Sequence, residues 1–290
     1  MRSIYANMHD LKTYITLASQ VVENDQTLLG YLKTASRSVD KFCRRHFYPI
    51  RQTRFYDYKL SQAIRLDADL LELDTLYTNN GASTLASGVL LLQTGNNYNY
   101  PPYERIVILS DTGCTLNYSG TDQKSQHVLG FWGYHENYSE EAWVDTGTSL
   151  AASYVSGASQ ITVLGGSTGL SDINWESPRF AVGDTLKIGD EMFFAAGGNS
   201  NVVNVIPHIN GTSANHHASL VPVYRFEPEP EIQFATLRLA AWLNGQMMSP
   251  YENKTVFVQF GALNVPQSLA TDVKARIERF VKTTIVTIPD

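Results

Sequence analysis

The most regular hydrophobic pattern in the chain lies in residues 25–45, where apolar side chains recur at alternating spacings of four and three. They are Leu28, Leu32, Ala35, Val39 and Phe42. This spacing places them on one face of an α-helix. Pro49 predicts the end of the helix near residues 46–48, because proline disfavours helical backbone in the residue before it. We expect residues 51–58 to continue as an extended segment.

A similar helical periodicity appears near both ends of the chain. Residues 7–18 predict a short first helix capped by Asn7, and residues 232–243 predict a later helix that Pro250 ends. A last helix is predicted after Pro266. The side chains expected to form the shared core of these helices are Leu28, Leu32, Val39, Phe42, Leu239, Trp242, Leu269, Val273 and Ile277.

The middle of the chain has a β pattern instead. Between residues 59 and 145, short apolar runs alternate with clusters of Gly, Asn, Pro and Ser, which is typical of a small sandwich or barrel. Residues 146–225 repeat this character after a stretch rich in Gly and Ser. A hairpin is predicted over residues 180–196, with its turn at Gly189 and Asp190.

These patterns together predict an α+β fold: a helical bundle built from both chain ends, with projecting β-sandwich or barrel-like regions. The predicted division has three parts. Residues 1–58 and 226–290 form the helical core, residues 59–145 form one β-region, and residues 146–225 form a small inserted β-domain.

The charge balance of the 290-residue chain argues against tight DNA binding. Its formal net charge is −6 and its pI is 5.6, whereas nucleic-acid binders use basic surfaces that neutralise phosphates. Charged residues make up only 17% of the chain, and 16 residues are tyrosine. A surface poor in charge and rich in tyrosine suits a protein with several faces against partners, although a β core also absorbs aromatic side chains.

Cysteine use and hydropathy indicate the expected environment. Cys43 and Cys114 lie in unrelated segments, so we expect reduced thiols and neither a disulfide framework nor a zinc site. No apolar run approaches the roughly 20 residues of a transmembrane helix, and the start lacks the pattern of a signal peptide. The chain is therefore expected to be soluble and cytosolic when made.

The motif Asp-Thr-Gly, found in aspartic-protease loops, occurs at residues 111–113 and 145–147. Those enzymes need two such loops in repeated half-domains, each followed by Ser or Ala, whereas Cys114 follows the first copy here. We interpret both copies as turns. Turn or surface roles are also expected for the histidines, which are His9, His46, His127, His135, His208, His216 and His217. The sequence predicts no enzyme, no cofactor and no metal site.

One concentrated basic patch is present, and it consists of Lys41, Arg44, Arg45, Arg51 and Arg54. Two interpretations remain open. The first is a solvated face at the C-terminal end of a helix, where the helix dipole favours cations. The second is a contact with an acidic partner surface or with the DNA backbone.

The stretch from residue 25 to residue 57 has a distinctive order of features. A Leu-rich helix carries small residues and an aromatic, basic end, followed by an aromatic-proline segment and a Thr-Arg-x-x-Asp strand: Thr34, Ala35, Ser36, Phe42, Arg44, Arg45, Phe47, Tyr48 and Pro49. This order resembles tailed-phage head-to-tail connector (adaptor) proteins. Residues 180–191 and 210–214 are similar to a β-module of phage structural proteins, and residues 235–243 are similar to the C-terminal helices of connectors.

The resemblance implies a structural virion protein that forms a ring of about twelve copies. The ring would join the portal protein to the tail, through a stopper, tail-tube or tail-terminator protein. DNA would pass through its lumen without specific binding, and an acidic chain suits such a passage. The implied location is the virion neck, with assembly in the host cytoplasm and no membrane partner.

Two other classes of function remain open. A carbohydrate-binding tail or fibre module would explain the tyrosines, whose faces stack on sugars, but leaves the helical ends unexplained. A hydrolase is the third alternative.

The segment after residue 282 is β-branched at almost every position, and its central residues are Thr284, Ile285, Val286, Thr287 and Ile288. Such a terminal segment is suited to adding a strand to the sheet of another protein. We expect it to dock on a neighbour, and the resemblance implies that this neighbour is the portal. A strand that pairs within its own subunit is the alternative.

Overall fold

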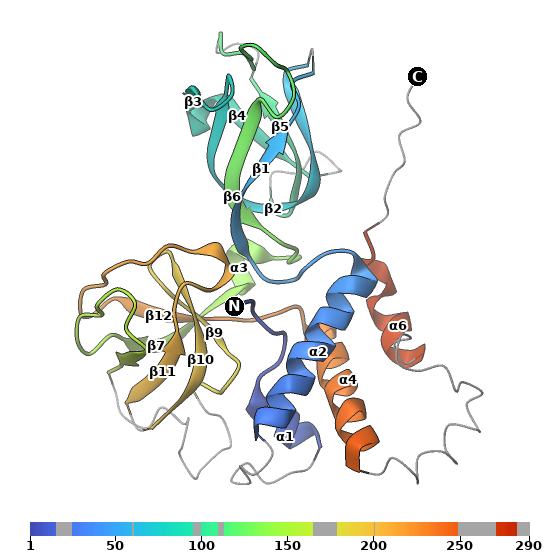
Figure 1. Cartoon of the computed structure of the whole chain (residues 1–290), viewed down its shortest axis with the longest axis vertical. Coiled ribbons are helices and arrows are strands. Elements are labelled where there is room, and N and C mark those ends of the chain that lie inside the picture. The colour runs from blue at the N-terminus through green and yellow to red at the C-terminus, as the bar shows by residue number, and fades with distance from the viewer. Residues whose placement is uncertain are drawn as a thin grey trace.

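The computed structural model describes residues 1–15, 25–59, 61–94, 100–109, 113–164, 179–199, 201–248 and 271–282. Most of this part of the chain is β. Two antiparallel sheets of six strands each form separate units, and a group of helices lies beside them (Figure 1).

The first sheet has the strand order β1-β6-β2-β5-β4, and β3 pairs with β2. Its strands are β1 (Ile50–Tyr56), β2 (Ala63–Thr78), β3 (Ser83–Leu85), β4 (Leu90–Gln93), β5 (Tyr103–Ile108) and β6 (Gln126–Trp132). Alternate residues of β6 face different cores. Trp132 and Val128 are buried inside this unit, whereas Phe131 is buried against the helices.

The second sheet has the order β7-β12-β9-β10-β11-β8. Its strands are β7 (Trp143–Ser149), β8 (Gln160–Thr162), β9 (Thr185–Ile188), β10 (Glu191–Asn199), β11 (Val202–Ile206) and β12 (Pro222–Phe226). The predicted hairpin is confirmed, since β9 and β10 pair in antiparallel register across Gly189 and Asp190. In β10, Phe193 faces the interior of this unit and Phe194 faces the helices, so both faces of the strand are covered.

The helices are α1 (Met8–Tyr14), α2 (Asp25–Cys43), the one-turn α3 (Tyr138–Glu141), α4 (Pro230–Met248) and α6 (Thr271–Ile277). In Figure 1, α2 lies along α4, and α1 and α6 flank α4. The predicted cap of α1 is confirmed, because the Asn7 side chain accepts a hydrogen bond from the Asp10 N–H at 2.9 Å. Helix α2 ends at Cys43, before the predicted end, because Arg44 adopts the left-handed conformation with φ 55°.

The predicted fold class, a helical bundle from both ends with projecting β-regions, is wrong. The two six-stranded sheets dominate the described structure, and the helices form no core of their own. Their apolar faces share one core with side chains from both sheets, including Leu71, Phe131, Met192 and Phe194. Helical periodicity specifies which face of a helix is apolar, but it does not specify whether a helix or a sheet covers that face.

The residues predicted for the helical core occupy different environments. Six of them are buried in the shared core: Leu28, Leu32, Val39, Leu239, Val273 and Ile277. Phe42 packs against this core while half-buried, and Trp242 is half-buried. Leu269 lies outside the described residues. The predicted domain division stays a prediction. Two strands cross its boundaries: β1 falls within the predicted helical core but belongs to the first sheet, and β7 of the second sheet begins at Trp143, before residue 146.

Candidate functional site

The candidate site is an open cleft of about 400 Å³ beside the C-terminal end of α2, called the basic cleft below. Its lining residues are Arg2, Arg37, Asp40, Lys41, Arg44, Arg45, His46 and Tyr48. Five of these eight are Arg or Lys and one is a carboxylate. Helix α2 brings several of them together, because side chains three or four positions apart lie on the same helix face.

Two of the cations are held in place by the fold. Arg37 donates to the Tyr48 hydroxyl at 2.6 Å, lies 3.0 Å from an Asp40 oxygen and also donates to the Ser3 carbonyl. The Arg45 guanidinium lies over the ring of Tyr134 and 3.5 Å from an Asp69 oxygen. These contacts fix the walls of the basic cleft.

The other three cations have no carboxylate within ion-pair distance among the described residues. They are Arg2, Lys41 and Arg44, and all three side chains are exposed. Arg44 also keeps a left-handed backbone, where a residue with a Cβ is strained and glycine is not. The positive potential of the basic cleft therefore comes from charges that the fold leaves open to solvent.

At pH 7 the titratable groups of the basic cleft add one negative charge, on Asp40, and no further positive charge. Burial raises the pKa of Asp40 to about 6, and Arg37, the hydrogen bond from Tyr5 and Arg2 counter this rise. Burial, together with Arg54, lowers the pKa of His46 to about 4. His46 is therefore neutral at pH 7, and its ring serves as a wall.

The structure divides the basic patch predicted from the sequence. Lys41, Arg44 and Arg45 line the basic cleft. The other two residues lie on β1 and pair with carboxylates of β2: Arg51 with Asp74 at 2.8 Å and Arg54 with Asp67 at 3.0 Å.

Sequence reasoning missed two cations of this cleft, Arg37 and Arg2. Arg37 could have been found, because it lies one helical turn before Lys41. Arg2 could not, because only the tertiary structure brings the start of the chain beside α2.

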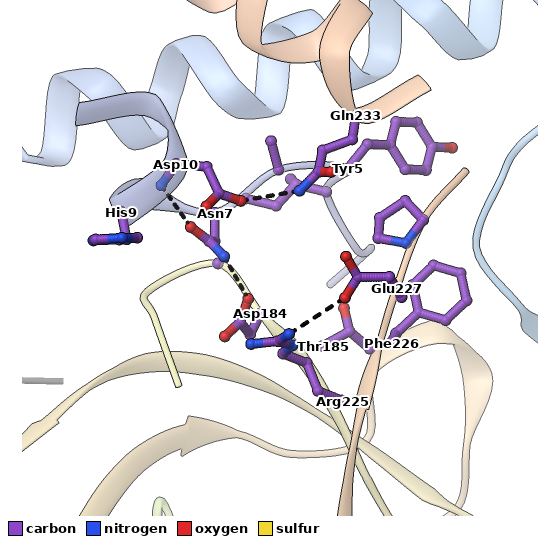
Figure 2. Close-up of a pocket in the computed structure, with 14 residues that line it drawn as sticks. Tyr5, Asn7, His9, Asp10, Asp184, Thr185, Arg225, Phe226, Glu227 and Gln233 are labelled. Carbon is purple, nitrogen blue, oxygen red and sulfur yellow. Dashed lines mark hydrogen bonds and ion pairs between the residues drawn. The ribbon is translucent and has the colours of Figure 1, made fainter. Parts of the chain in front are cut away.

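A second cavity, of about 320 Å³, lies between the N-terminal segment, the second sheet and α4. Figure 2 shows a line of hydrogen bonds across it, from Gln233 to Asp10, from the Asp10 N–H to Asn7, and from Asn7 to Asp184. Burial raises the pKa of Asp184 to about 6, even though Arg225 lowers it. The polar groups in this line bond to one another and join three parts of the chain.

Two of the histidines contact a fully buried carboxylate, Glu191 of β10. Its oxygens lie 2.6 Å from His208 Nδ1 and 2.9 Å from His217 Nε2, while His216 is exposed. Spacing along the chain did not reveal this acidic partner, because Glu191 lies on β10, far from both histidines in the sequence. Over the described ranges, no group of three or more potential metal ligands is arranged to hold an ion.

The remaining predicted features lie in different places. Asp145, in the second Asp-Thr-Gly motif, accepts a hydrogen bond from the Gly147 N–H at 2.8 Å within β7. Asp111 of the first motif lies outside the described residues. The proposed docking segment, residues 284–288, also lies outside them. Cys43 and Cys114 are both thiols, and burial raises the pKa of Cys43 to about 12.

No protein-family model, curated protein or solved structure matches the chain. None of the helices in the described ranges is long and apolar enough to cross a membrane.

Proposed function

We propose that the chain is a structural virion protein, a ring-forming head-to-tail connector (adaptor) in the neck of a tailed phage. It joins the portal protein to the tail or to a stopper, and DNA passes through the ring without specific binding. It assembles in the host cytoplasm. The supporting observation is that one short segment at the N-terminus ties both β-units and the helices together.

Residues 3–8 make this junction through hydrogen bonds in three directions. The Ser3 N–H donates to the Asn210 side chain at 3.1 Å, which attaches the segment to a loop of the second sheet. The Tyr5 N–H donates to Ser36 Oγ on α2 at 3.2 Å. The Tyr5 hydroxyl accepts a hydrogen bond from the Phe47 N–H at 2.8 Å, just before β1 begins.

The loop after β11 also meets the first sheet directly at this junction. Gly211 lies so close to β1 that a Cβ at this position would be 2.2 Å from the Arg51 carbonyl oxygen. Three units with separate outward surfaces are thus held in a fixed relation. Such a scaffold suits a protein that must contact neighbours of its own kind and two different partners at once.

The resemblance of residues 25–57 to connectors supports the same function. In the structure these residues are α2, the aromatic segment at Phe47 and Tyr48, and β1. They therefore connect the helices to the first sheet and include most of the basic cleft.

The mass of the purified full chain, measured alone and after mixing with purified portal rings, tests the proposal. We expect rings of about twelve copies, at least on the portal, and electron microscopy should place them on one face of the portal. A chain that stays monomeric and does not bind portals of its own phage would contradict the proposal.

A second candidate is a carbohydrate-binding module, which one feature of the first sheet favours. Phe55 is 53% exposed and lines an open cleft of about 860 Å³ together with the charged side chains Arg65 and Glu104. Aromatic faces bordered by polar groups are suited to sugars. A glycan array with the full chain and with Phe55→Ala separates the two candidates. A carbohydrate-binding module should bind glycans and lose that binding in the Phe55→Ala variant.

A further inference from the structure

The basic cleft holds three cations that the fold itself does not neutralise. Arg2, Lys41 and Arg44 are exposed and form no ion pair within contact distance among the described residues, in a chain whose net charge is −6. The neighbouring cations on β1 are neutralised, since Arg51 and Arg54 pair with carboxylates of β2. Exposed lysines also occur elsewhere, but in the basic cleft three open cations lie together.

A buried guanidinium nitrogen of the basic cleft, Arg45 Nε, lacks a hydrogen-bond partner in the described part of the chain. Buried donors of this kind are normally satisfied, and each exception calls for an explanation. A ligand with an acceptor oxygen, seated against this wall, would supply one.

The strained backbone of Arg44 is consistent with a ligand. Glycine is the usual residue at the left-handed position after a helix, and an L-residue there costs stability. Strain of this kind tends to occur where a side chain has a task beyond folding. The Arg44 guanidinium offers a planar fork of donors that matches a carboxylate or a phosphate.

From this geometry we infer that the basic cleft binds the carboxylates of an acidic protein segment, with Arg2, Lys41 and Arg44 as the binding cations. Duplex DNA fits less well, because it carries one charge per ~1.7 Å of its axis and needs a long basic track. Here the three open cations share one cleft of about 400 Å³. Beyond it, Arg51 and Arg54 are already paired.

This inference rests on the proposed function in one respect: a connector would receive the acidic segment from a neighbouring protein of the neck. The binding itself does not need a ring, so it can be measured on the isolated full chain. Fluorescence anisotropy would follow a short labelled peptide of alternating Glu and Gly, with a Gln-Gly peptide and a short DNA duplex as the other probes.

The variant Arg2→Gln/Lys41→Gln/Arg44→Gln removes the open charges. Its matched control, Lys33→Gln/Lys59→Gln/Lys124→Gln, removes the same charge from exposed lysines elsewhere. We expect the Glu-Gly peptide to bind about tenfold more weakly to the first variant and to change by less than about twofold in the control. Arg44→Gly, whose backbone suits this position, should weaken binding without lowering the melting temperature.

Three results would overturn the inference: no binding of the Glu-Gly peptide at low salt, equal losses in the two triple variants, or tighter binding of the duplex than of the peptide. Portal binding by the unmodified chain separates the two proposals. If rings still assemble while the peptide does not bind, only the acidic-segment inference fails. If the peptide binds the cleft but no ring forms on the portal, only the connector function fails.

Discussion

Asn210 holds Ser3 with both atoms of its side-chain amide, although 207 positions separate the two residues. The amide oxygen accepts from the Ser3 N–H at 3.1 Å, and the amide nitrogen donates to the Ser3 hydroxyl at 2.7 Å. Both residues are buried. The loop after β11 is thereby attached to the beginning of the chain.

Asn210→Ala should therefore lower the free energy of unfolding by about 1–3 kcal/mol, because it leaves the buried Ser3 N–H without a partner, whereas the Ser3 hydroxyl keeps its hydrogen bond from Thr185. Asn79→Ala is the matched control, since Asn79 has the same φ of 56° in a turn. Thermal unfolding of both variants measures the difference. Equal shifts would show that only the left-handed backbone matters.

Gly211→Ala should disrupt the contact between the loop after β11 and β1. The added Cβ would lie 2.2 Å from the Arg51 carbonyl oxygen, a backbone atom that cannot move alone. Gly157→Ala is the control, because Gly157 has a similar positive φ with nothing within 4 Å of the added Cβ. We expect Gly211→Ala to cost at least about 2 kcal/mol more in urea unfolding. A difference near zero would mean that the contact yields easily.

Asp40 should make stability fall as the pH rises from about 4 to about 6. Its pKa is raised from 3.8 to about 6, so in this range the folded chain binds a proton that the unfolded chain has lost. Asp184 contributes in the same direction. Asp40→Asn should reduce the change in unfolding free energy between pH 4 and 7 by on the order of 2 kcal/mol.

Chemical unfolding across that pH range, with Asp190→Asn at an exposed turn as the control, measures the effect. An Asp40→Asn profile parallel to that of the unmodified chain would refute the assignment.

Leu32→Asp should prevent stable folding. Leu32 is fully buried in the core that α2 shares with the sheets, and an unpaired carboxylate there costs several kcal/mol. Ser38→Asp, at an exposed position of the same helix, should be tolerated. Circular dichroism and the soluble yield distinguish the two, and a soluble, fully folded Leu32→Asp protein would contradict the burial of this face.

Truncation after Lys282 should leave the fold intact but stop assembly on portals. Lys282 anchors the chain before the cut, because its N–H donates to the Cys43 carbonyl at 2.9 Å and its Nζ lies 3.2 Å from Asp69. The removed segment includes the proposed docking residues, Thr284 to Ile288. Melting temperature and portal co-sedimentation test both parts. A truncated chain that still binds portals would exclude the docking role.

The local features of this chain could be predicted from its sequence. The apolar face of α2, the Asn7 cap and the β9–β10 hairpin depend on residues within a few positions of one another, so their periodicity and turn chemistry are sufficient. Three cations of the basic cleft also follow from their closeness along the chain.

The architecture and the complete site were decided only by tertiary structure. Whether the helices cover each other or cover sheets depends on how Phe131 and Phe194 share a core with α2, and no local pattern encodes that choice. Arg2 lines the basic cleft, whereas Arg51 lies outside it and pairs with Asp74. Contacts between distant segments therefore determine which charges are neutralised. Spacing along the chain identifies side chains on one face of an element, whereas a site between elements needs the packing itself.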